Sequence, residues 1–303
     1  MKPSEAALSK TSSGPPSERH KGINSLNDMQ GYDPRALERI LNRQPIPWEL
    51  EYHAAVSSTN TRAKEIARIS PEALPLVVLA DHQSAGRGRL GRVWISPAGS
   101  GIWCSFLFRP EIVAAAVPRY TIIAGVAAAK AIEMASGLQP ELKWPNDLLI
   151  GQRKVGGVLS EAGLRQTDTG PPVADFVVVG IGINVDIDPS YLPLELQGAA
   201  TSLAREVGAP VSRQTVLEEL VRQVSSGLGQ ADDNGFCEVL EEWRSLNCTL
   251  GRRIRVRQGA AWVEGVARDI DSAGSLVYQD GAGSQHTIGS GEVIQLRHIN
   301  CND

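Results

Sequence analysis

Through the middle of the chain, the spacing of apolar positions switches between a pattern typical of strands and a pattern typical of helices. Short apolar runs predict strands at residues 48–56, 75–81, 101–108, 142–144, 147–150, 154–161 and 176–185. Longer stretches with apolar residues on recurring faces predict helices at residues 119–135, 213–228 and 236–247. A further helix runs to Ile69 from the N-cap candidates Ser57-Ser58-Thr59-Asn60. Residues 46–248 therefore form one domain that alternates between α and β.

Both ends of the chain have a different texture. Residues 1–30 are polar and rich in Ser, Pro and Lys, which predicts disorder, and Asp33-Pro34 opens a short helix to about Arg43. We treat residues 1–45 as a largely disordered N-terminal extension. Beyond Leu250, Gly-, Asp- and Ser-rich turns separate short strands at residues 254–257, 261–270, 276–278, 285–288 and 293–296. Such strands predict a second domain over residues 249–303, a small β-barrel of about 50 residues.

Composition narrows the classes of protein. Apolar residues make up 42% of the chain, enough for a sizeable core. A formal net charge of −4 argues against a broad basic nucleic-acid footprint, and the N-terminal region is too poor in periodic apolar residues for a winged-helix DNA reader. The polar N-terminal residues lack the apolar stretch expected of a signal peptide. The apolar run near Ile122–Ala129 is too short to span a bilayer, and the cysteines do not have the spacing of a zinc site. We expect a cytoplasmic protein that binds neither DNA nor membrane.

The segment Ser84–Arg92, here called the Arg/Gly loop, carries the most informative motif, Gly86-Arg87-Gly88-Arg89-Leu90-Gly91-Arg92. It formally contains GxGxxG, but a dinucleotide fingerprint must open a helix. The next residues are instead Val93-Trp94-Ile95-Ser96-Pro97, an extended segment interrupted by proline. Three arginines on a glycine frame are suited to closing over a polyanion, whereas a lone arginine pair is usually just solvated.

Three further segments carry groups suited to anions or to close ligand approach. In Lys143-Trp144-Pro145-Asn146-Asp147, the Asp147 carboxylate could bind Mg²⁺ or only cap the turn, and Trp144 is expected in the core. Arg153-Lys154-Val155-Gly156-Gly157 puts an ammonium beside bare backbone amides. In Gly180-Ile181-Gly182-Ile183-Asn184, glycines allow close approach of a ligand or simply close packing.

One kind of reaction needs such segments together. Condensing a carboxylate with ATP brings two anions together, and like charges about 4 Å apart repel by roughly 4 kcal/mol at an effective dielectric of 20. Arginine, lysine and Mg²⁺ offset that repulsion, and no Ser or Cys nucleophile motif is evident. The residues alone therefore predict an anion-handling α/β enzyme and leave its substrate open.

In this order and spacing, GRGRLGR, KWPND and RKVGG resemble the signature of biotin–protein ligases, over roughly residues 48–298. The C-terminal β domain resembles the SH3-like domain of that family. The resemblance implies an α+β fold of the class II synthetase-like type, a mixed β-sheet flanked by helices, with a small C-terminal SH3-like β-barrel. It also implies activation of biotin with ATP and Mg²⁺, and transfer of biotin to a lysine of a biotin carboxyl carrier protein. Whether the protein forms a homodimer is left open by the sequence.

The resemblance assigns roles by motif match. It implies biotin contacts from Ser58, Thr59, Asn60, Gln83, Gly86, Arg87, Lys154, Gly156 and Gly157. It implies ATP contacts from Arg89, Arg92, Trp94, Lys143, Asn146 and Asn184, with Mg²⁺ at Asp147. Lys154 is the leading catalytic residue, with Arg87 and Arg89 beside it.

Two departures and three alternatives qualify the resemblance. Leu90 stands where family members often carry another arginine, and the missing DNA-binding domain implies a monofunctional ligase. A lipoate–protein ligase would share the fold and the adenylation chemistry, but GRGRLGR with KWPND favours biotin. A non-catalytic biotin- or nucleotide-binding regulator is disfavoured by intact Lys154 and Asp147. A structural module that uses the Arg/Gly loop only for protein contact would leave four anion-suited segments as coincidence.

Overall fold

The computed structural model describes residues 29, 31–70, 75–231, 233–258, 261–289 and 293–295. Its larger unit is built on a seven-stranded sheet in the order β1-β2-β3-β7-β6-β5-β4. The strands are β1 (Glu49–Val56), β2 (Leu76–Gln83), β3 (Gly101–Phe108), β4 (Glu141–Lys143), β5 (Asp147–Ile150), β6 (Arg153–Arg165) and β7 (Val173–Asn184). Of the described strand pairs in this sheet, β1 and β2 run parallel and the others are antiparallel. The predicted mixed sheet is confirmed.

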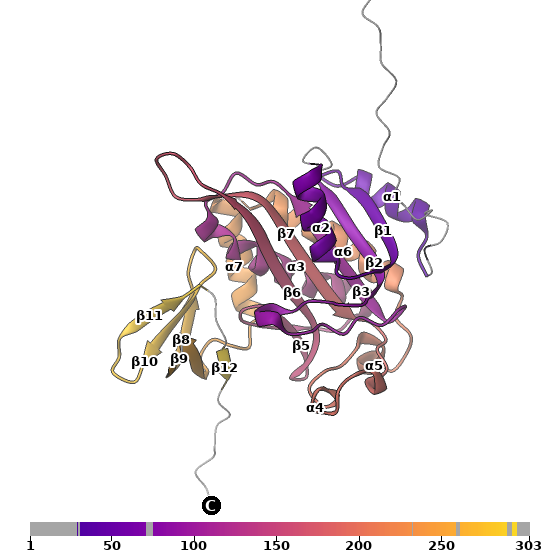
Figure 1. Ribbon diagram of the computed structural model, residues 1–303. Coiled ribbons are helices and arrows are strands. Elements are labelled where there is room, and N and C mark those ends of the chain that lie inside the picture. Colours follow the sequence, from indigo (N-terminus) through magenta and orange to yellow (C-terminus); the bar gives the residue numbers. More distant parts are fainter. Residues whose placement is uncertain are drawn as a thin grey trace, which may run out of the picture.

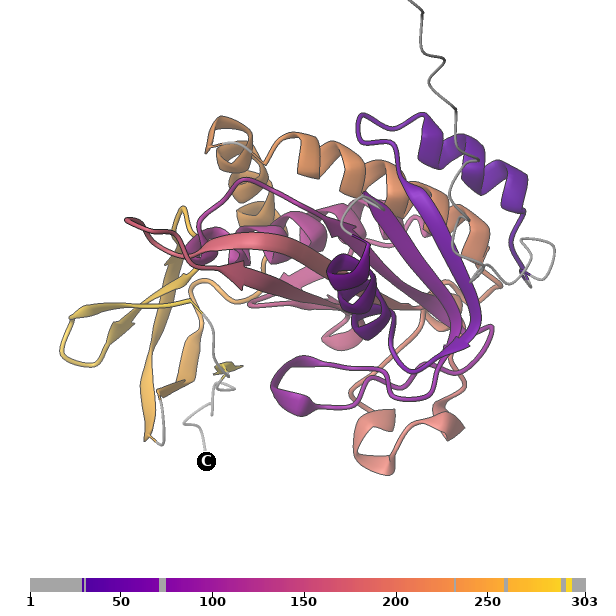
Figure 2. The ribbon, with the colours of Figure 1, turned by 45° about the horizontal axis from the view of Figure 1, so that its top comes forward.

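Helices cover both faces of this sheet (Figures 1 and 2). One face carries α3 (Pro118–Ser136), α6 (Arg213–Gly229) and α7 (Asp233–Leu246), and the other carries α2 (Thr59–Ile69). Strand β2 explains this division, because its side chains alternate between faces. Val77 and Leu79 join the large core beneath α3 and α6, whereas Leu76 and Val78 join a small core under α2.

The apolar stretch Ala114–Ser136 has the length and composition of a membrane-spanning helix. Its most apolar window is, however, 67% buried inside the fold. Most of the stretch forms α3, whose buried residues run from Tyr120 to Ile132 and pack against the sheet and α6. This helix therefore serves as the central core element of the larger unit.

The N-terminal helix α1 (Pro34–Asn42) packs on this unit. It begins as predicted, with Asp33 accepting hydrogen bonds from the Arg35 and Ala36 amides at 2.9 and 3.2 Å. Leu37 and Leu41 are buried in the large core. The expected extension over residues 1–45 thus contains a helix that belongs to the packed body, while the disorder expected for residues 1–28 falls outside the described residues.

The C-terminal unit is a five-stranded antiparallel sheet in the order β11-β10-β9-β8-β12. Its strands are β8 (Arg253–Gln258), β9 (Ala261–Ile270), β10 (Leu276–Asp280), β11 (Gln285–Ile288) and β12 (Val293–Gln295). The closed barrel that we expected is not formed by the described residues. The edge strands β11 and β12 have 4 and 3 residues, and within the described part of the chain each pairs with one inner neighbour only.

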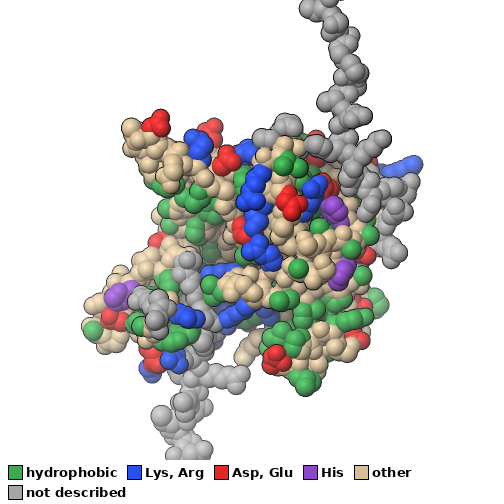
Figure 3. Space-filling model, viewed as in Figure 1, with side chains coloured by type: hydrophobic (Ala, Val, Ile, Leu, Met, Phe, Trp, Pro, Cys, Tyr) green, Lys and Arg blue, Asp and Glu red, His purple; other side chains and the backbone are tan. Residues whose placement is uncertain are grey.

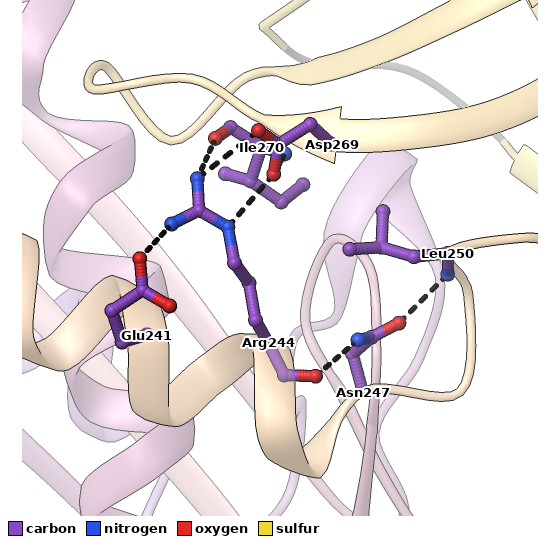
Figure 4. A network of polar contacts seen from close by, with 6 residues as sticks. All are labelled: Glu241, Arg244, Asn247, Leu250, Asp269 and Ile270. Carbon is purple, nitrogen blue, oxygen red and sulfur yellow. Dashed lines mark hydrogen bonds and ion pairs between the residues drawn. The ribbon is translucent and has the colours of Figure 1, made fainter.

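Helix α7 joins the two units through a polar network (Figure 4). Arg244 donates from Nε to Asp269 Oδ1 at 2.8 Å and from Nη2 to the Ile270 carbonyl at 3.0 Å. Just after the helix, Asn247 donates to the Arg244 carbonyl at 2.6 Å and accepts from the Leu250 amide at 2.7 Å. The end of α7 is therefore capped and held against β9 at the same place.

The segment after β4 is also held between the units. Trp144 is 1% exposed, which confirms its expected place in the core. Its indole Nε1 donates to the Gly274 carbonyl at 3.2 Å, and its amide donates to Thr249 Oγ1 at 2.9 Å. The C-terminal unit thereby helps to place Asn146 and Asp147, which come after Trp144 in the chain.

Candidate active site

A pocket of about 430 Å³ opens between α2, the Arg/Gly loop, and strands β6 and β7. Lysine and arginine side chains gather around the hollow on this face (Figure 3). All of the site residues predicted from the sequence line this pocket except Gly86 and Gly156. Segments far apart in the sequence therefore meet at one place, as the predicted reaction requires.

One part of the pocket wall is a neutral hydrogen-bonding network. Gln83 Oε1 accepts from the Thr59 amide at 2.9 Å and from Thr59 Oγ1 at 3.2 Å. Gln83 Nε2 donates to Ser96 Oγ at 2.9 Å. Ser105 Oγ lies 2.7 Å from Thr59 Oγ1 and 2.6 Å from Asn60 Oδ1. The start of α2, the end of β2 and the middle of β3 are thus joined by polar contacts.

The glycine motif on β7 makes room for this network. A Cβ at position 180 would lie 2.0 Å from Asn60 Oδ1 and 2.8 Å from its Cγ. No side chain fits that gap, so Gly180 is required for Asn60 to sit against β7. Of the two expectations for this motif, close packing is therefore the one that the geometry explains at this position.

A second part of the pocket wall is charged. Lys154 Nζ, on β6, lies 2.5 Å from Asp147 Oδ1, on β5. Arg89 Nη1 donates to Asn146 Oδ1 at 3.4 Å. Burial lowers the pKa of the Arg89 guanidinium, while the nearby Asp147 carboxylate works in the opposite direction. Two cations thus converge on one carboxylate, a neighbourhood suited to a ligand with phosphate groups.

The Trp94 ring lies on strand β7, between these two parts of the pocket wall. A Cβ at Gly182 would lie 2.7 Å from the indole Nε1, so the ring rests directly on the β7 backbone. Lys154 Nζ lies 5.2 Å from the ring centroid in a cation–π contact. Nε1 is buried and has no hydrogen-bond partner among the described residues. A buried donor left unpaired is costly, so this indole is suited to donating to a ligand.

The Arg/Gly loop folds back on itself as an irregular hairpin. Gly88 N donates to the Arg92 carbonyl at 2.7 Å, and Trp94 N donates to the Gly86 carbonyl at 2.9 Å. Only a three-residue 3₁₀ turn, Arg89–Gly91, interrupts it. No dinucleotide-type helix begins here, which agrees with rejecting that motif. At the tip Leu90 has a φ of 56° and is 65% exposed.

The remaining predicted residues take supporting places. The Asn184 side chain is buried and donates to the Thr201 carbonyl at 3.0 Å. Gly86 packs so closely that a Cβ there would lie 2.2 Å from the Trp94 carbonyl oxygen. At Gly156 a Cβ would meet Leu148 Cδ1 at 3.4 Å and the Gly182 carbonyl oxygen at 3.0 Å. These two glycines therefore shape the site without lining it.

Sequence reasoning missed three parts of the site. Ser105 bridges Thr59 and Asn60, and its signal was a lone hydroxyl inside the apolar run of β3. Glu161 contacts Asn60 and Lys64 from β6. An apolar wall comes from the segment after β7, for which the sequence predicted no element: Ile187, Leu192, Leu196, Ala199 and Ala200.

A pocket with one neutral hydrogen-bonding wall and one cationic wall, over a mixed sheet, suits the class of enzymes that join a small acid to a nucleotide. The family comparison narrows this class. Residues 52–184 match the biotin/lipoate A/B protein ligase family, and residues 249–295 match the biotin protein ligase C-terminal domain. The chain belongs to the biotin–protein ligase family.

Individual relatives agree with this assignment. The bifunctional ligase/repressor BirA of Bacillus subtilis is 36% identical over 88% of this chain and 80% of that protein. The biotin--[acetyl-CoA-carboxylase] ligase of Mycobacterium tuberculosis is 31% identical over 90% of this chain and 100% of that protein. The biotin protein ligase of Aquifex aeolicus, solved with biotin and ATP, is 28% identical with a TM-score of 0.66, covering 82% of this chain and 99% of that one.

Proposed function

We propose that this chain activates biotin with ATP and transfers it to a lysine of a biotin carboxyl carrier domain. The observation that carries the proposal is the pairing of a neutral polar wall with a cationic wall in one pocket of about 430 Å³. Family membership and the names of the relatives, which include biotin--[acetyl-CoA-carboxylase] ligases, support the same substrate class.

The neutral wall favours the urea ring of biotin over the dithiolane ring of lipoate. A cyclic urea offers one carbonyl acceptor and two N–H donors. Thr59, Asn60 and Gln83 carry hydroxyl and amide groups of both kinds on the pocket wall, and their hydrogen bonds to one another and to neighbouring residues fix how these groups point. A dithiolane has neither an N–H donor nor a carbonyl acceptor and so would make no such hydrogen bonds with this wall, which disfavours it relative to biotin.

The cationic wall suits the first step. A biotin carboxylate oxygen attacks the α-phosphorus of ATP, the bond to the bridging oxygen breaks, and pyrophosphate leaves with its electron pair. Lys154 and Arg89 offset the repulsion between the two anions and stabilise the charge that develops on the phosphorus oxygens. The ion pair with Asp147 at 2.5 Å holds the Lys154 ammonium toward that place.

The residues present fit a Mg²⁺ ion that arrives with the nucleotide. Asp147 supplies one carboxylate and Asn146 one amide oxygen, and no group of three or more His, Cys, Asp or Glu side chains occurs among the described residues. Magnesium is commonly held by one or two carboxylates together with substrate phosphates. Bound there, the ion would neutralise phosphate charge during pyrophosphate release.

In the second step a carrier lysine, as the free amine, attacks the acyl carbon of biotinyl-AMP. An amide bond forms, AMP leaves, and the amine loses a proton to solvent. The chain needs to hold the mixed anhydride away from water until the carrier arrives. The Arg/Gly loop and Trp94, which cover one side of the pocket, suit that task.

A transfer assay tests the whole proposal. Purified chain, ATP, Mg²⁺ and biotin are incubated with a biotin carboxyl carrier domain, and the product is read as a streptavidin shift and an intact mass. A gain of one biotin on the carrier, absent when its target lysine is replaced by arginine, supports the proposal. An unmodified carrier, despite a folded ligase, contradicts it.

A further inference from the structure

Glu161 is a charged residue directly behind the site wall, in contact with the pocket-lining residues Asn60 and Arg87, and neither the motifs nor the proposed reaction assigns it a role. It lies on β6, and its carboxylate contacts two other segments. Oε2 accepts from Asn60 Nδ2 at 3.0 Å, and Oε1 lies 2.6 Å from Lys64 Nζ. Oε1 also lies 3.7 Å from Arg87 Nη2, on the Arg/Gly loop. Glu161 therefore joins β6 to both α2 and the loop.

The charge on Glu161 is maintained by these neighbours. Burial raises the pKa of the carboxyl, but hydrogen bonds from Lys64 and Asn60 and the nearby Arg87 charge outweigh it, so that the pKa lies below its usual value. The side chain is 21% exposed. An ionised carboxylate only accepts hydrogen bonds, and α2 and the loop supply the donors.

This acceptor decides which way the Asn60 amide points. Asn60 donates one amide hydrogen to Glu161 and the other to the Leu159 carbonyl at 3.1 Å. Its Oδ1 must then face Ser105, at 2.6 Å. Turning the amide over would place its oxygen against a carboxylate and a carbonyl, which repel it. The acceptor–donor order along the neutral wall therefore depends on the charge of Glu161.

Glu161 also holds the first arginine of the loop. The Arg87 side chain is 48% exposed and forms an ion pair with Glu161. Because the pair lies at the base of the hairpin, it holds the loop close to the first turn of α2, where Asn60 lines the pocket. One carboxylate thus sets both the orientation of a wall residue and the position of the loop that covers it.

We infer that Glu161 is a positioning residue that orders the biotin half of the pocket, by which we mean the neutral wall and the adjoining base of the Arg/Gly loop. It does so through Asn60 on one side and Arg87 on the other. The inference rests on the proposed function, because it assumes that the neutral wall receives biotin. It distinguishes Glu161 from a residue that merely anchors α2 to the sheet.

Glu51 provides the matched control for that distinction. It is a second half-buried carboxylate that holds α2, through Arg62 Nε at 2.7 Å. It does so from β1, however, and its partners do not line the pocket, whereas those of Glu161 include Asn60 and Arg87, which do. We compare Glu161→Gln with Glu51→Gln, because each removes one charge and keeps the side-chain size. Both variants and the unmodified chain are measured by biotin-dependent ATP–pyrophosphate exchange and by thermal melting.

Glu161→Gln is expected to raise the KM for biotin on the order of tenfold, because it weakens a hydrogen bond to a charged group. Its kcat and its KM for ATP should stay within about twofold of those of the unmodified chain. Glu51→Gln is expected to leave all three within about twofold. Without any ligand, trypsin should cut the Arg/Gly loop several-fold faster in Glu161→Gln than in Glu51→Gln.

Equal biotin KM values and equal loop cleavage in the two variants would overturn the role of Glu161, provided that the unmodified chain is active. An equal rise in the KM for ATP would also overturn it, because the effect would then not be confined to the biotin half. No biotin-dependent exchange by the unmodified chain would instead contradict the proposed function itself, and the role of Glu161 with it.

Discussion

Replacing Lys154 by methionine separates catalysis from stability. The Lys154 ammonium lies 2.5 Å from Asp147 Oδ1, and the two side chains are 33% and 26% exposed. A partly exposed pair of this kind contributes about 0–1 kcal/mol to folding, and methionine keeps most of the side-chain volume. A change of about 1 kcal/mol moves the melting temperature of a domain of this size by about 2–4 °C. The variant should therefore melt within about 4 °C of the unmodified chain.

The expected loss of rate is much larger. A preorganised donor aimed at charge that develops in the transition state is worth roughly 10²–10³ in kcat. Lys154→Met should accordingly lower biotin-dependent ATP–pyrophosphate exchange by that factor.

Lys130→Met is the control for this experiment, because Lys130 also pairs with a carboxylate, Glu242 Oε2 at 2.6 Å, with 41% and 33% exposure, and does not line the pocket. It should exchange at the unmodified rate. Exchange by Lys154→Met at the rate of Lys130→Met would refute our placing of Lys154 at the reacting phosphate.

Single contacts lead to three further predictions. Arg89→Gly removes a partly buried cation of the charged wall, so the variant should release biotinyl-AMP from the pocket. Bystander lysines should then be labelled on the order of tenfold more in a mass-spectrometric assay. Labelling confined to the carrier at the unmodified rate would contradict this. Gly180→Ala places a Cβ 2.0 Å from Asn60 Oδ1 and should lower the free energy of unfolding by about 1–3 kcal/mol in a thermal melt and raise the biotin KM. Gly198→Ala, where a Cβ meets no atom of the described residues within 4 Å, should do neither. Burial raises the pKa of Glu51, but hydrogen bonds from its two partners outweigh it and hold the pKa at about 2. The contribution of the ionised Glu51 carboxylate to the free energy of unfolding is present above the usual pKa of 4.5 and is lost as pH falls toward 2. The gap in urea midpoint between the unmodified chain and Glu51→Gln should therefore shrink from about pH 6 to about pH 3. A constant gap would contradict the assignment.

Elements of the fold were predictable where the signal is local. The strand expected at residues 101–108 has these bounds in the structure, because an apolar run between glycine and proline signals is a property of the run itself. The caps Asp33 and Ser58 were predictable for the same reason, since a capping side chain bonds amides two or three residues away. The motifs likewise marked most of the pocket lining.

What the sequence could not predict depends on which distant segments meet. Ser105 and Glu161 take part in the site only because β3 and β6 both pair with β7, which brings them to α2. Periodicity does not record such pairing. The barrel expectation failed similarly, because closure depends on contact between β11 and β12 at the two edges of the C-terminal sheet, and these strands are not paired among the described residues.

The most direct test of the central claim is pyrophosphate release from ATP and Mg²⁺ by the purified chain, run in parallel with biotin, with lipoate and with no acid. Release that requires biotin, and that lipoate does not support, is the result expected from the hydrogen-bonding wall of Thr59, Asn60 and Gln83. Release with lipoate alone would contradict the choice of acid and assign the pocket to lipoate. No release with either acid from a folded sample would contradict the claim that this site activates a carboxylate.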